Sequence, residues 1–134
     1  MAAMKPAFSV KAKRSAAGLG LYAEEKIPRR ARIIEYFGEV IPDAEADIRL
    51  GKYLFELGNG NTIDGTTRQN VARYINHSCK PNCEAILDGK RVFINAMRAI
   101  EPGDELSYDY GKDYFKQMVR ENGGCRCGHH HKTK

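Results

Sequence analysis

The chain has 134 residues, enough for a single domain with one hydrophobic core. Hydrophobic residues make up 42% and charged residues 29%, which excludes a wholly disordered, collagenous or coiled-coil chain. The formal net charge of +5 is mild, and its basic residues near both ends are expected to form solvated tails. Apolar stretches are too short to span a bilayer, and residues 1–15 lack a signal-peptide core. We therefore expect an intracellular protein without membrane contact.

Short strand-like runs separated by turn signals make up most of the chain. In order, the runs with strand character are 20–23, 32–37, 53–57, 82–87, 91–96 and 105–110. Asp88-Gly89 joins the fourth and fifth runs, and this dipeptide between apolar runs is typical of a β-hairpin. Helical signals predict short helices over 44–50 and 67–74 and an amphipathic helix over 113–120. The sequence therefore predicts a mostly β domain with two or three small helices.

The stretch from Arg73 to Cys79 reads Arg-Tyr-Ile-Asn-His-Ser-Cys and is too polar for a plain strand end. Three interpretations are open. The first is a turn with capping side chains. The second is a cysteine nucleophile beside a histidine, although such pairs usually come from distant parts of a chain. The third is a binding loop in which Asn76 and His77 hydrogen-bond a polar ligand.

Two other stretches contain candidate ligand-binding residues. Tyr108 and Tyr110 stand two positions apart in a strand-like run and therefore share one face. They form either a half-buried aromatic strand or a pair of phenols lining a channel for an amine. Gly18 and Gly20 let the backbone bend and approach a ligand, although a tight turn is the simpler interpretation. Without a strand–helix unit and a third glycine, they are not a dinucleotide fingerprint.

Four cysteines stand in two close pairs, Cys79 with Cys83 and Cys125 with Cys127. Because no secretory signal is recognised, disulfides are not the default interpretation. The one-residue gap between Cys125 and Cys127, followed by histidines at 129–131, is more typical of a metal site than of a disulfide. The alternative for the histidines is a fragment of a purification tag.

Taken in this order, the stretches resemble the SET-domain protein lysine methyltransferases. The resemblance runs from about residue 8 to 128, and its most specific motifs are Asn-His-Ser-Cys at 76–79 and Glu-Leu-Ser-Tyr-Asp-Tyr at 105–110. Supporting matches are Gly-Leu-Gly-Leu-Tyr-Ala at 18–23, Glu-Tyr-Phe-Gly-Glu at 35–39, Tyr-Leu-Phe at 53–55, Ile-Asp-Gly at 63–65, Pro-Asn-Cys at 81–83 and Cys-Arg-Cys at 125–127. The resemblance implies a SET domain over 8–111 and a post-SET-like C-terminal helix and Cys/His tail over 112–134.

The fold that the resemblance implies is mostly β and β-clip-like. Several small β-sheets and a few short helices would surround a knot-like core, with residues 73–79 threaded through a loop of the C-terminal part. Such threading is rare among folds and does not follow from the hydrophobic pattern. The implied reaction is methyl transfer from S-adenosylmethionine to the side-chain nitrogen of a protein lysine. Cofactor and lysine would enter from opposite faces and meet in a narrow channel.

The resemblance also implies roles for individual residues. Those matching the cofactor site are Ala17, Gly18, Leu19, Gly20, Tyr53, Asn76 and His77. Three tyrosines match the catalytic lysine channel. Tyr110 matches the catalytic tyrosine, Tyr108 matches the residue that tunes the number of methyl groups added, and Tyr53 matches a residue that lines the channel. Arg73, Asn70 and Glu105 are expected to be structural supports.

The chemistry of lysine methylation agrees with an aromatic channel. A free lysine has a pKa of about 10.4, so at pH 7 almost all of it is ammonium, which cannot attack. Desolvation among aromatic rings and a nearby sulfonium charge both lower that pKa. Alignment of nitrogen, methyl carbon and sulfur then supplies much of the rate, without a covalent intermediate on Cys79. In the family, tyrosine at position 108 goes with low methylation states, so we expect mainly monomethylation.

A structural zinc site is the second implication of the resemblance. Cys79, Cys125 and Cys127 match three of the family's four zinc ligands. His129, His130 or His131 would be the fourth ligand, with His130 favoured, and would complete a normal Cys₃His set. Cys83 is expected to be a buried or free thiol. If zinc does not order the tail, the enzyme would be weak or would need a partner. The alternative function is a catalytically weak SET-like zinc-binding interaction module.

The expected partner is a protein that presents a lysine: a histone, a histone-like protein or a ribosomal protein. Only about ten residues precede the match, and the segment 43–66 is short, as in stand-alone microbial or viral SET proteins. We therefore expect a microbial cytoplasmic protein or one delivered to a host nucleus, which is a monomer or homodimer and contacts nucleic acid only indirectly. The competing functions are a silent SET-like binding module, a zinc-dependent interaction domain and a cysteine hydrolase.

Overall fold

The structure, a computed structural model, describes residues 3–15, 18–49 and 53–110. Within these ranges the chain forms four small β-sheets, one α-helix and one 3-10 helix, which confirms the expected mostly β architecture. The elements are β1 (Val10–Ser15), β2 (Gly18–Ala23), β3 (Arg32–Tyr36), β4 (Glu39–Pro42), α1 (Asp43–Arg49), β5 (Leu54–Glu56), β6 (Asn61–Asp64), η1 (Val71–Tyr74), β7 (Asn76–His77), β8 (Cys83–Asp88), β9 (Arg91–Ala96) and β10 (Ser107–Tyr108). Neither helix in these ranges is long or apolar enough to span a membrane.

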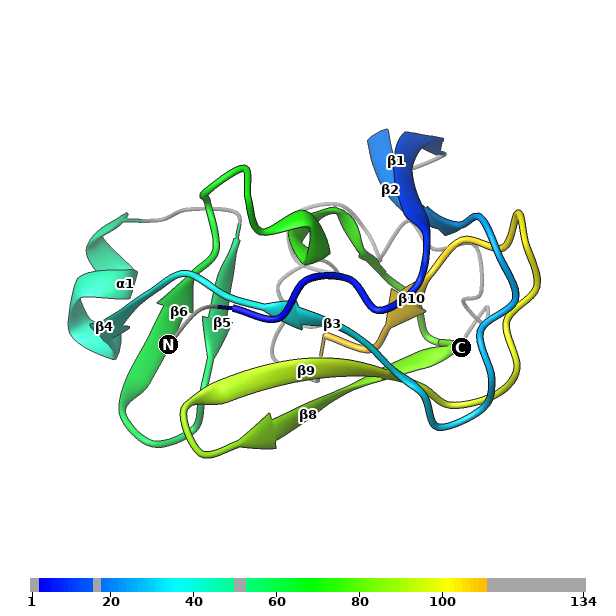
Figure 1. Ribbon diagram of the computed structural model, residues 1–134. Coiled ribbons are helices and arrows are strands. Elements are labelled where there is room, and N and C mark those ends of the chain that lie inside the picture. Colours follow the sequence, from blue (N-terminus) through cyan, green and yellow to red (C-terminus); the bar gives the residue numbers. More distant parts are fainter. Residues whose placement is uncertain (1–2, 16–17, 50–52, 111–134) are drawn as a thin grey trace, which may run out of the picture.

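The four sheets are separate and small. Two have three strands, in the orders β3-β9-β8 and β4-β6-β5, and the others are the antiparallel hairpin β1-β2 and the parallel pair β7-β10. In Figure 1 the β4-β6-β5 sheet and α1 lie at the left and the β1-β2 hairpin at the upper right. Strands β8 and β9 run along the bottom, and β10 lies between the hairpin and this lower sheet.

The hairpin predicted at Asp88-Gly89 is confirmed. Strands β8 and β9 pair antiparallel, with Asp88 opposite Arg91. Gly89 is the first of the two loop residues and has φ +65°, the left-handed conformation that a type II′ turn requires there. The short helix predicted over 44–50 is also present, as α1.

Three other expectations differ from the structure. The basic residues at 11–14 belong to β1, where they lie along a two-stranded hairpin whose edge tolerates charged side chains. The helix predicted over 67–74 is only the 3-10 helix η1, because the Asn70 side chain bonds outside the local segment, to Phe37 and Gly65. The strand predicted over 105–110 is only β10. The predicted helix over 113–120 and the C-terminal loop of the threaded core lie outside the described residues.

The core consists mainly of branched aliphatic side chains from β2, β3, β9 and the loops beside them. The largest fully buried ones are Leu21, Ile27, Ile33, Ile34, Ile75, Val92, Ile94, Ile100 and Leu106. Burying one such side chain stabilises the fold by roughly 1.5–3 kcal/mol. Tyr36 and Tyr108 belong to this buried cluster, whereas Phe55, Tyr74 and Tyr110 are partly exposed and pack at its boundary.

Long-range pairing brings the sequence motifs together. In the parallel pair, Ser107 lies opposite Asn76 and Tyr108 opposite His77. An isolated antiparallel bridge between Tyr22 and Glu105 brings the glycine-rich strand β2 to the same place. Three segments that are about thirty or more residues apart in sequence therefore meet around β7.

Candidate active site

The side-chain amide of Asn76 makes several contacts beside β2. Its Nδ2 donates to the Leu19 carbonyl at 3.0 Å and to Glu105 Oε2 at 2.9 Å, and it lies 3.3 Å from Ser15 Oγ. A Cβ placed on Gly20 would lie 2.3 Å from Glu105 Oε2, so glycine is required for this approach. The arrangement places the polar backbone of β2 against the amide of Asn76.

The backbone at the start of β2 has room beside it. Gly18 has φ +106°, a conformation that favours glycine, and among the described residues no atom lies within 4 Å of the position a Cβ would take there. Leu19 is 52% exposed although it is apolar. The expected contact of Gly18, Leu19 and Gly20 with a ligand stays a prediction. Ala17, predicted with them, lies outside the described residues.

His77 links the two most specific motifs. Its buried ring accepts a hydrogen bond at Nδ1 from the backbone N–H of Tyr110 at 3.0 Å. A neutral imidazole with an acceptor at Nδ1 carries its proton on Nε2, and Nε2 lies 3.5 Å from Cys79 Sγ. Since Nε2–H is then a donor, the neutral ring cannot take a proton from Cys79. This geometry disfavours the interpretation of Cys79 as a nucleophile activated by His77.

Aromatic rings form a row beside this motif. The rings of Tyr108 and Tyr110 have centroids 4.8 Å apart, as expected for two tyrosines on one face. The row continues from Tyr108 to Phe55 at 6.3 Å and from Phe55 to Tyr36 at 5.4 Å. Tyr110 donates its hydroxyl proton to the carbonyl of Ile75. The row joins β10, β5 and β3 and has phenols at both ends.

Tyr53, the third predicted channel tyrosine, lies close to the far end of this row. Burial, followed by the proximity of Asp64 and Tyr53, raises the pKa of Tyr36 above its ordinary value. The carbonyl of Tyr53 accepts a hydrogen bond from the Gly65 N–H at 2.7 Å. Its ring lies 4.7 Å from the guanidinium carbon of Arg73. Tyr53 is thus attached to the turn at 64–66 and to η1.

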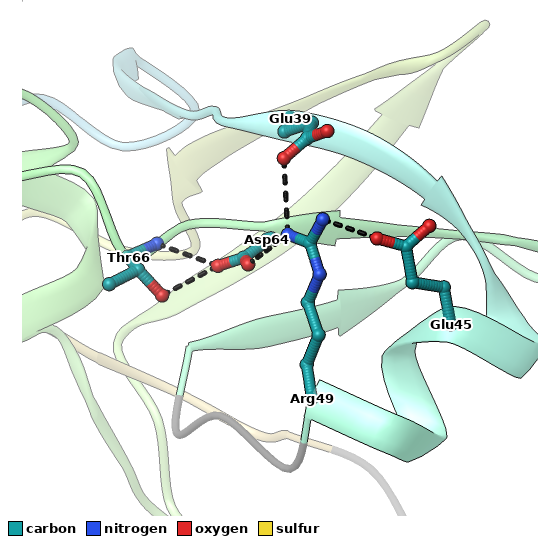
Figure 2. Close-up of polar contacts among 5 residues, drawn as sticks. All are labelled: Glu39, Glu45, Arg49, Asp64 and Thr66. Carbon is teal, nitrogen blue, oxygen red and sulfur yellow. Dashed lines mark hydrogen bonds and ion pairs between the residues drawn. The ribbon is translucent and has the colours of Figure 1, made fainter.

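Arg49, which the sequence analysis did not single out, links α1 to the β4-β6-β5 sheet beside the turn at 64–66. Arg49, at the end of α1, donates through Nη1 to Glu39 Oε1 at 3.1 Å and to Asp64 Oδ2 at 2.7 Å, and through Nη2 to Glu45 (Figure 2). The other Asp64 oxygen accepts from the Thr66 N–H and hydroxyl. Glu45 and Arg49 stand four apart, which is the one signal of this cluster visible in the sequence.

The three expected supports make long-range contacts. Asn70 is fully buried; its Oδ1 accepts from the Phe37 N–H at 3.1 Å, and its Nδ2 donates to the Gly65 carbonyl at 3.0 Å. Glu105 accepts from Asn76, and Arg73 contacts Tyr53. Each of these side chains therefore joins segments that are distant in sequence.

The two described cysteines differ in environment. Cys83 is fully buried, and burial raises the pKa of its thiol to about 12, so it is an inert thiol as expected. Cys79 is only partly buried. Among the described residues no group of three or more histidine, cysteine or acidic side chains is placed to hold a metal. The other predicted ligands, Cys125, Cys127 and His130, lie outside the described residues.

Comparison with known proteins agrees with the motifs. Residues 18–111 match the family described as the SET domain. The chain is 47% identical over 104 residues to an H3 lysine-4 specific histone-lysine N-methyltransferase of Aspergillus oryzae, covering 68% of this chain and 8% of that protein. It is 39% identical over 127 residues to a protein of the same name from Chaetomium globosum, covering 81% and 11%. It is 42% identical over 123 residues to the histone-lysine N-methyltransferase trr of Drosophila melanogaster, covering 83% and 5%. The chain thus spans about a tenth or less of the length of these relatives.

Proposed function

The chain belongs to the SET-domain family of protein lysine methyltransferases, and on this premise we propose that it transfers a methyl group from S-adenosylmethionine to a lysine of a histone-type protein. The observation that carries the proposal is the parallel pair β7-β10. It holds Asn76 and His77, the predicted cofactor pair, directly beside Tyr108 and the neighbouring Tyr110.

The residues around β2 and β7 fit the cofactor. S-adenosylmethionine has an amino-acid end that needs hydrogen-bonding partners. Among the described residues the backbone has open space beside it at Gly18, and the next residue, Leu19, contacts the Asn76 amide through its carbonyl. We propose that Gly18, Leu19, Gly20, Asn76 and His77 hold this end, together with Ala17, and that Tyr53 lines the lysine side of the site. When bound, the cofactor supplies a methyl group on a positively charged sulfur.

The aromatic row is the proposed lysine side of the site. Rings of Tyr108, Tyr110 and Phe55 exclude water from an entering side chain, and their faces attract an ammonium group. Desolvation there lowers the lysine pKa from about 10.4 toward neutral pH, so that the neutral amine is populated. The Tyr110 hydroxyl and the Ile75 carbonyl, which lie together, provide polar groups to orient the amine. No protein nucleophile is required.

The same row supports a proposal on product specificity. Tyr108 is 5% exposed and packs between Phe55 and Tyr110. A phenol at this position adds a hydroxyl that can hold a water molecule where a methylated nitrogen would need space. We propose that the main product is monomethyl-lysine.

The substrate proposal rests on the relatives. Those described above are named histone-lysine methyltransferases, and two of them are named as H3 lysine-4 specific. We propose a histone or histone-like substrate, with ribosomal proteins as the second class to be tested, and accordingly an intracellular site of action. Whether the protein acts as a monomer or homodimer is a separate measurement.

We also propose that a zinc ion orders the C-terminal tail. Cys79 would be the ligand from the body of the domain, and Cys125, Cys127 and His130 the ligands from the tail, which is a common structural donor set. The Nε2–H of His77 points to Cys79 Sγ, and a hydrogen bond of this kind typically supports a metal-bound thiolate.

The test is methyl transfer from radiolabelled S-adenosylmethionine to purified core histones, ribosomal proteins and an H3 amino-terminal peptide. The matched control is Tyr110→Phe, which keeps the ring and removes the hydroxyl. We expect label on a histone with the wild-type protein and a loss of at least tenfold in rate with the variant. Cofactor binding without transfer to any of these proteins would favour the SET-like interaction module instead.

A further inference from the structure

Arg73 lies on η1, three residues before Asn76, and its guanidinium packs on two tyrosine rings. The guanidinium carbon is 4.7 Å from the ring centroid of Tyr53 and 4.9 Å from that of Tyr74. Nη2 contacts the Tyr74 hydroxyl at 3.0 Å, and Nη1 donates to the carbonyl of Thr66. Nε is buried without a hydrogen-bond partner among the described residues. Two rings and two oxygens therefore hold the group in one orientation.

The turn that Arg73 contacts also holds the backbone of Tyr53. Gly65 donates its N–H to the Tyr53 carbonyl, and the next residue, Thr66, provides the carbonyl that Arg73 binds. Tyr53 is thus attached to one unit twice, through its carbonyl and through its ring. If the Arg73 guanidinium is removed, the backbone of Tyr53 keeps its hydrogen bond to Gly65, whereas the ring of Tyr53 loses its contact with the guanidinium.

The turn is itself firmly placed. Asp64 lies between Arg49 on one side and Thr66 on the other, as Figure 2 shows. A Cβ on Gly65 would lie 2.5 Å from Asn70 Nδ2 and 2.6 Å from the Tyr36 ring, so the turn is packed closely against both. Because the turn is held firmly, the Arg73 side chain that binds to it can fix the position of the neighbouring Tyr53 ring.

The contacts of Arg73 are separate from those of the cofactor side. Asn76 is held by Leu19, Ser15 and Glu105, whereas the guanidinium contacts Tyr53, Tyr74 and Thr66. Replacing Arg73 should therefore change the lysine side of the site and leave the cofactor side intact. The contact between a guanidinium and an aromatic face changes an equilibrium constant by roughly two- to thirtyfold, depending on how far the two groups are desolvated.

We propose that Arg73 is a positioning residue for the substrate lysine: its guanidinium fixes the ring of Tyr53 and thereby sets the affinity for the substrate peptide. This inference rests on the proposed function, in which Tyr53 lines the lysine channel. Lysine at position 73 would keep the charge but lose the planar group that packs on the ring and reaches two oxygens at once.

The experiment compares steady-state kinetics of the wild-type protein with Arg73→Gln, Arg73→Lys and Arg68→Gln, using an H3 amino-terminal peptide. Arg68 is the matched control, because it lies in the loop just before η1 and is exposed. For Arg73→Gln we expect the peptide KM to rise about tenfold while the KM for S-adenosylmethionine stays within twofold. The peptide KM of Arg73→Lys should lie between the values for the wild type and Arg73→Gln, and the peptide KM of Arg68→Gln should match that of the wild type. Equal changes in both KM values, or an unchanged peptide KM, overturn the proposal.

A double-mutant cycle separates action through Tyr53 from a general structural effect. In the Tyr53→Leu background the ring is absent, so Arg73→Gln should lower kcat/KM for the peptide by less than twofold. A tenfold loss in that background means that Arg73 acts elsewhere and contradicts the proposal. If Arg73→Gln does not fold, the same cycle is measured with Arg73→Lys.

An NMR readout keeps this inference distinct from the proposed function. In a protein with ¹³C-labelled tyrosine, the Tyr53 signals are those absent from the spectrum of Tyr53→Leu. We expect Arg73→Gln to shift these signals and Arg68→Gln to leave them unchanged, whether or not the peptide is a substrate. Absence of methyl transfer by the wild type would therefore refute the proposed function, and unshifted Tyr53 signals would refute the role of Arg73.

Discussion

At the scale of single residues, the site depends on which atom of each side chain is already engaged. The Nδ1 of His77 accepts from the backbone of Tyr110, which assigns the proton of the neutral ring to Nε2. The Tyr110 hydroxyl is directed to the Ile75 carbonyl. These contacts leave neither group as a base for Cys79, and they hold Tyr110 in place through both its backbone and its side chain.

Tyr108→Phe should raise the proportion of di- and trimethyl-lysine in the product. The ring remains, so packing against Phe55 and Tyr110 is kept, while the hydroxyl and any water that it holds are removed. Mass spectrometry of the H3 peptide after long incubation measures the product distribution. Dominant trimethylation by the wild-type protein would contradict the assignment of Tyr108.

Glu35→Gln should lower the free energy of unfolding at pH 7 by about 1–3 kcal/mol, since Glu35 is buried and accepts two hydrogen bonds from Arg91. The hydrogen bonds from Arg91, helped by the Met4 N–H, hold the pKa of Glu35 below its ordinary value. A carboxyl with a lowered pKa in the folded state stabilises the fold above its unfolded pKa, and this contribution is lost as pH falls through the folded pKa.

Denaturant unfolding of wild-type and Glu35→Gln proteins across the acidic range checks this linkage. The difference in stability should be full at pH 7 and shrink at low pH, where the wild-type carboxyl is also neutral. Glu84→Gln, which changes an exposed carboxyl on β8 of the same sheet, is the matched control and should show little change. A difference that does not depend on pH would mean that charge is not the cause.

At the scale of elements, α1 is too short to be stable alone. It has seven residues, and Ala46 is its one buried residue. Isolated helices of this length are marginal in water. Its position is therefore set by contacts with β4 and β6, and Arg49 makes the ion pairs to Glu39 on β4 and Asp64 on β6 (Figure 2).

Arg49→Gln should increase hydrogen exchange in α1 and in the turn at 64–66 while core amides in β3 and β9 stay protected. The expected cause is the loss of three carboxylate contacts by one guanidinium. Hydrogen exchange followed by mass spectrometry measures it segment by segment. Asp47→Asn, an exposed change on the same helix, is the control. Uniform acceleration across all segments would indicate global destabilisation instead.

At the scale of the whole molecule, small sheets meet around one short parallel pair. Neither β7 nor β10 exceeds two residues, yet their pairing joins the Asn-His-Ser-Cys and Tyr-Asp-Tyr motifs. Tyr110, the last described residue, binds the His77 ring through its N–H, and Cys79 lies on the other side of that ring. A metal shared between Cys79 and the C-terminal tail would tie the ends of this arrangement together.

Cys79→Ser should abolish binding of zinc in the purified full-length protein, whereas Cys83→Ala should retain it. Cys79 is partly exposed and is a proposed ligand, while Cys83 is buried in the core with a pKa raised to about 12. Elemental analysis of protein prepared without a histidine tag gives the metal content. Zinc bound equally by Cys79→Ser and the wild type would refute the proposed ligand set.

The sequence was informative where the signal is local. Asp88-Gly89 between apolar runs predicted the β8-β9 hairpin, and local helical signals over 44–50 predicted α1. The strand β1 was missed, because alternating lysines on an exposed hairpin look like a solvated tail. The helix over 67–74 was overpredicted, because Asn70 uses its side chain to bind Phe37 and Gly65.

What the sequence by itself determined is the family, because the spacing of Asn76, His77, Tyr108 and Tyr110 is specific. What only the tertiary structure decided is how these residues are placed. The proton position on His77, the contacts of Asn76 with the β1-β2 hairpin and the packing of Arg73 on Tyr53 join segments 20 to 61 residues apart. Such contacts depend on strand register and on which surfaces the core leaves exposed, and a local pattern of residues contains neither.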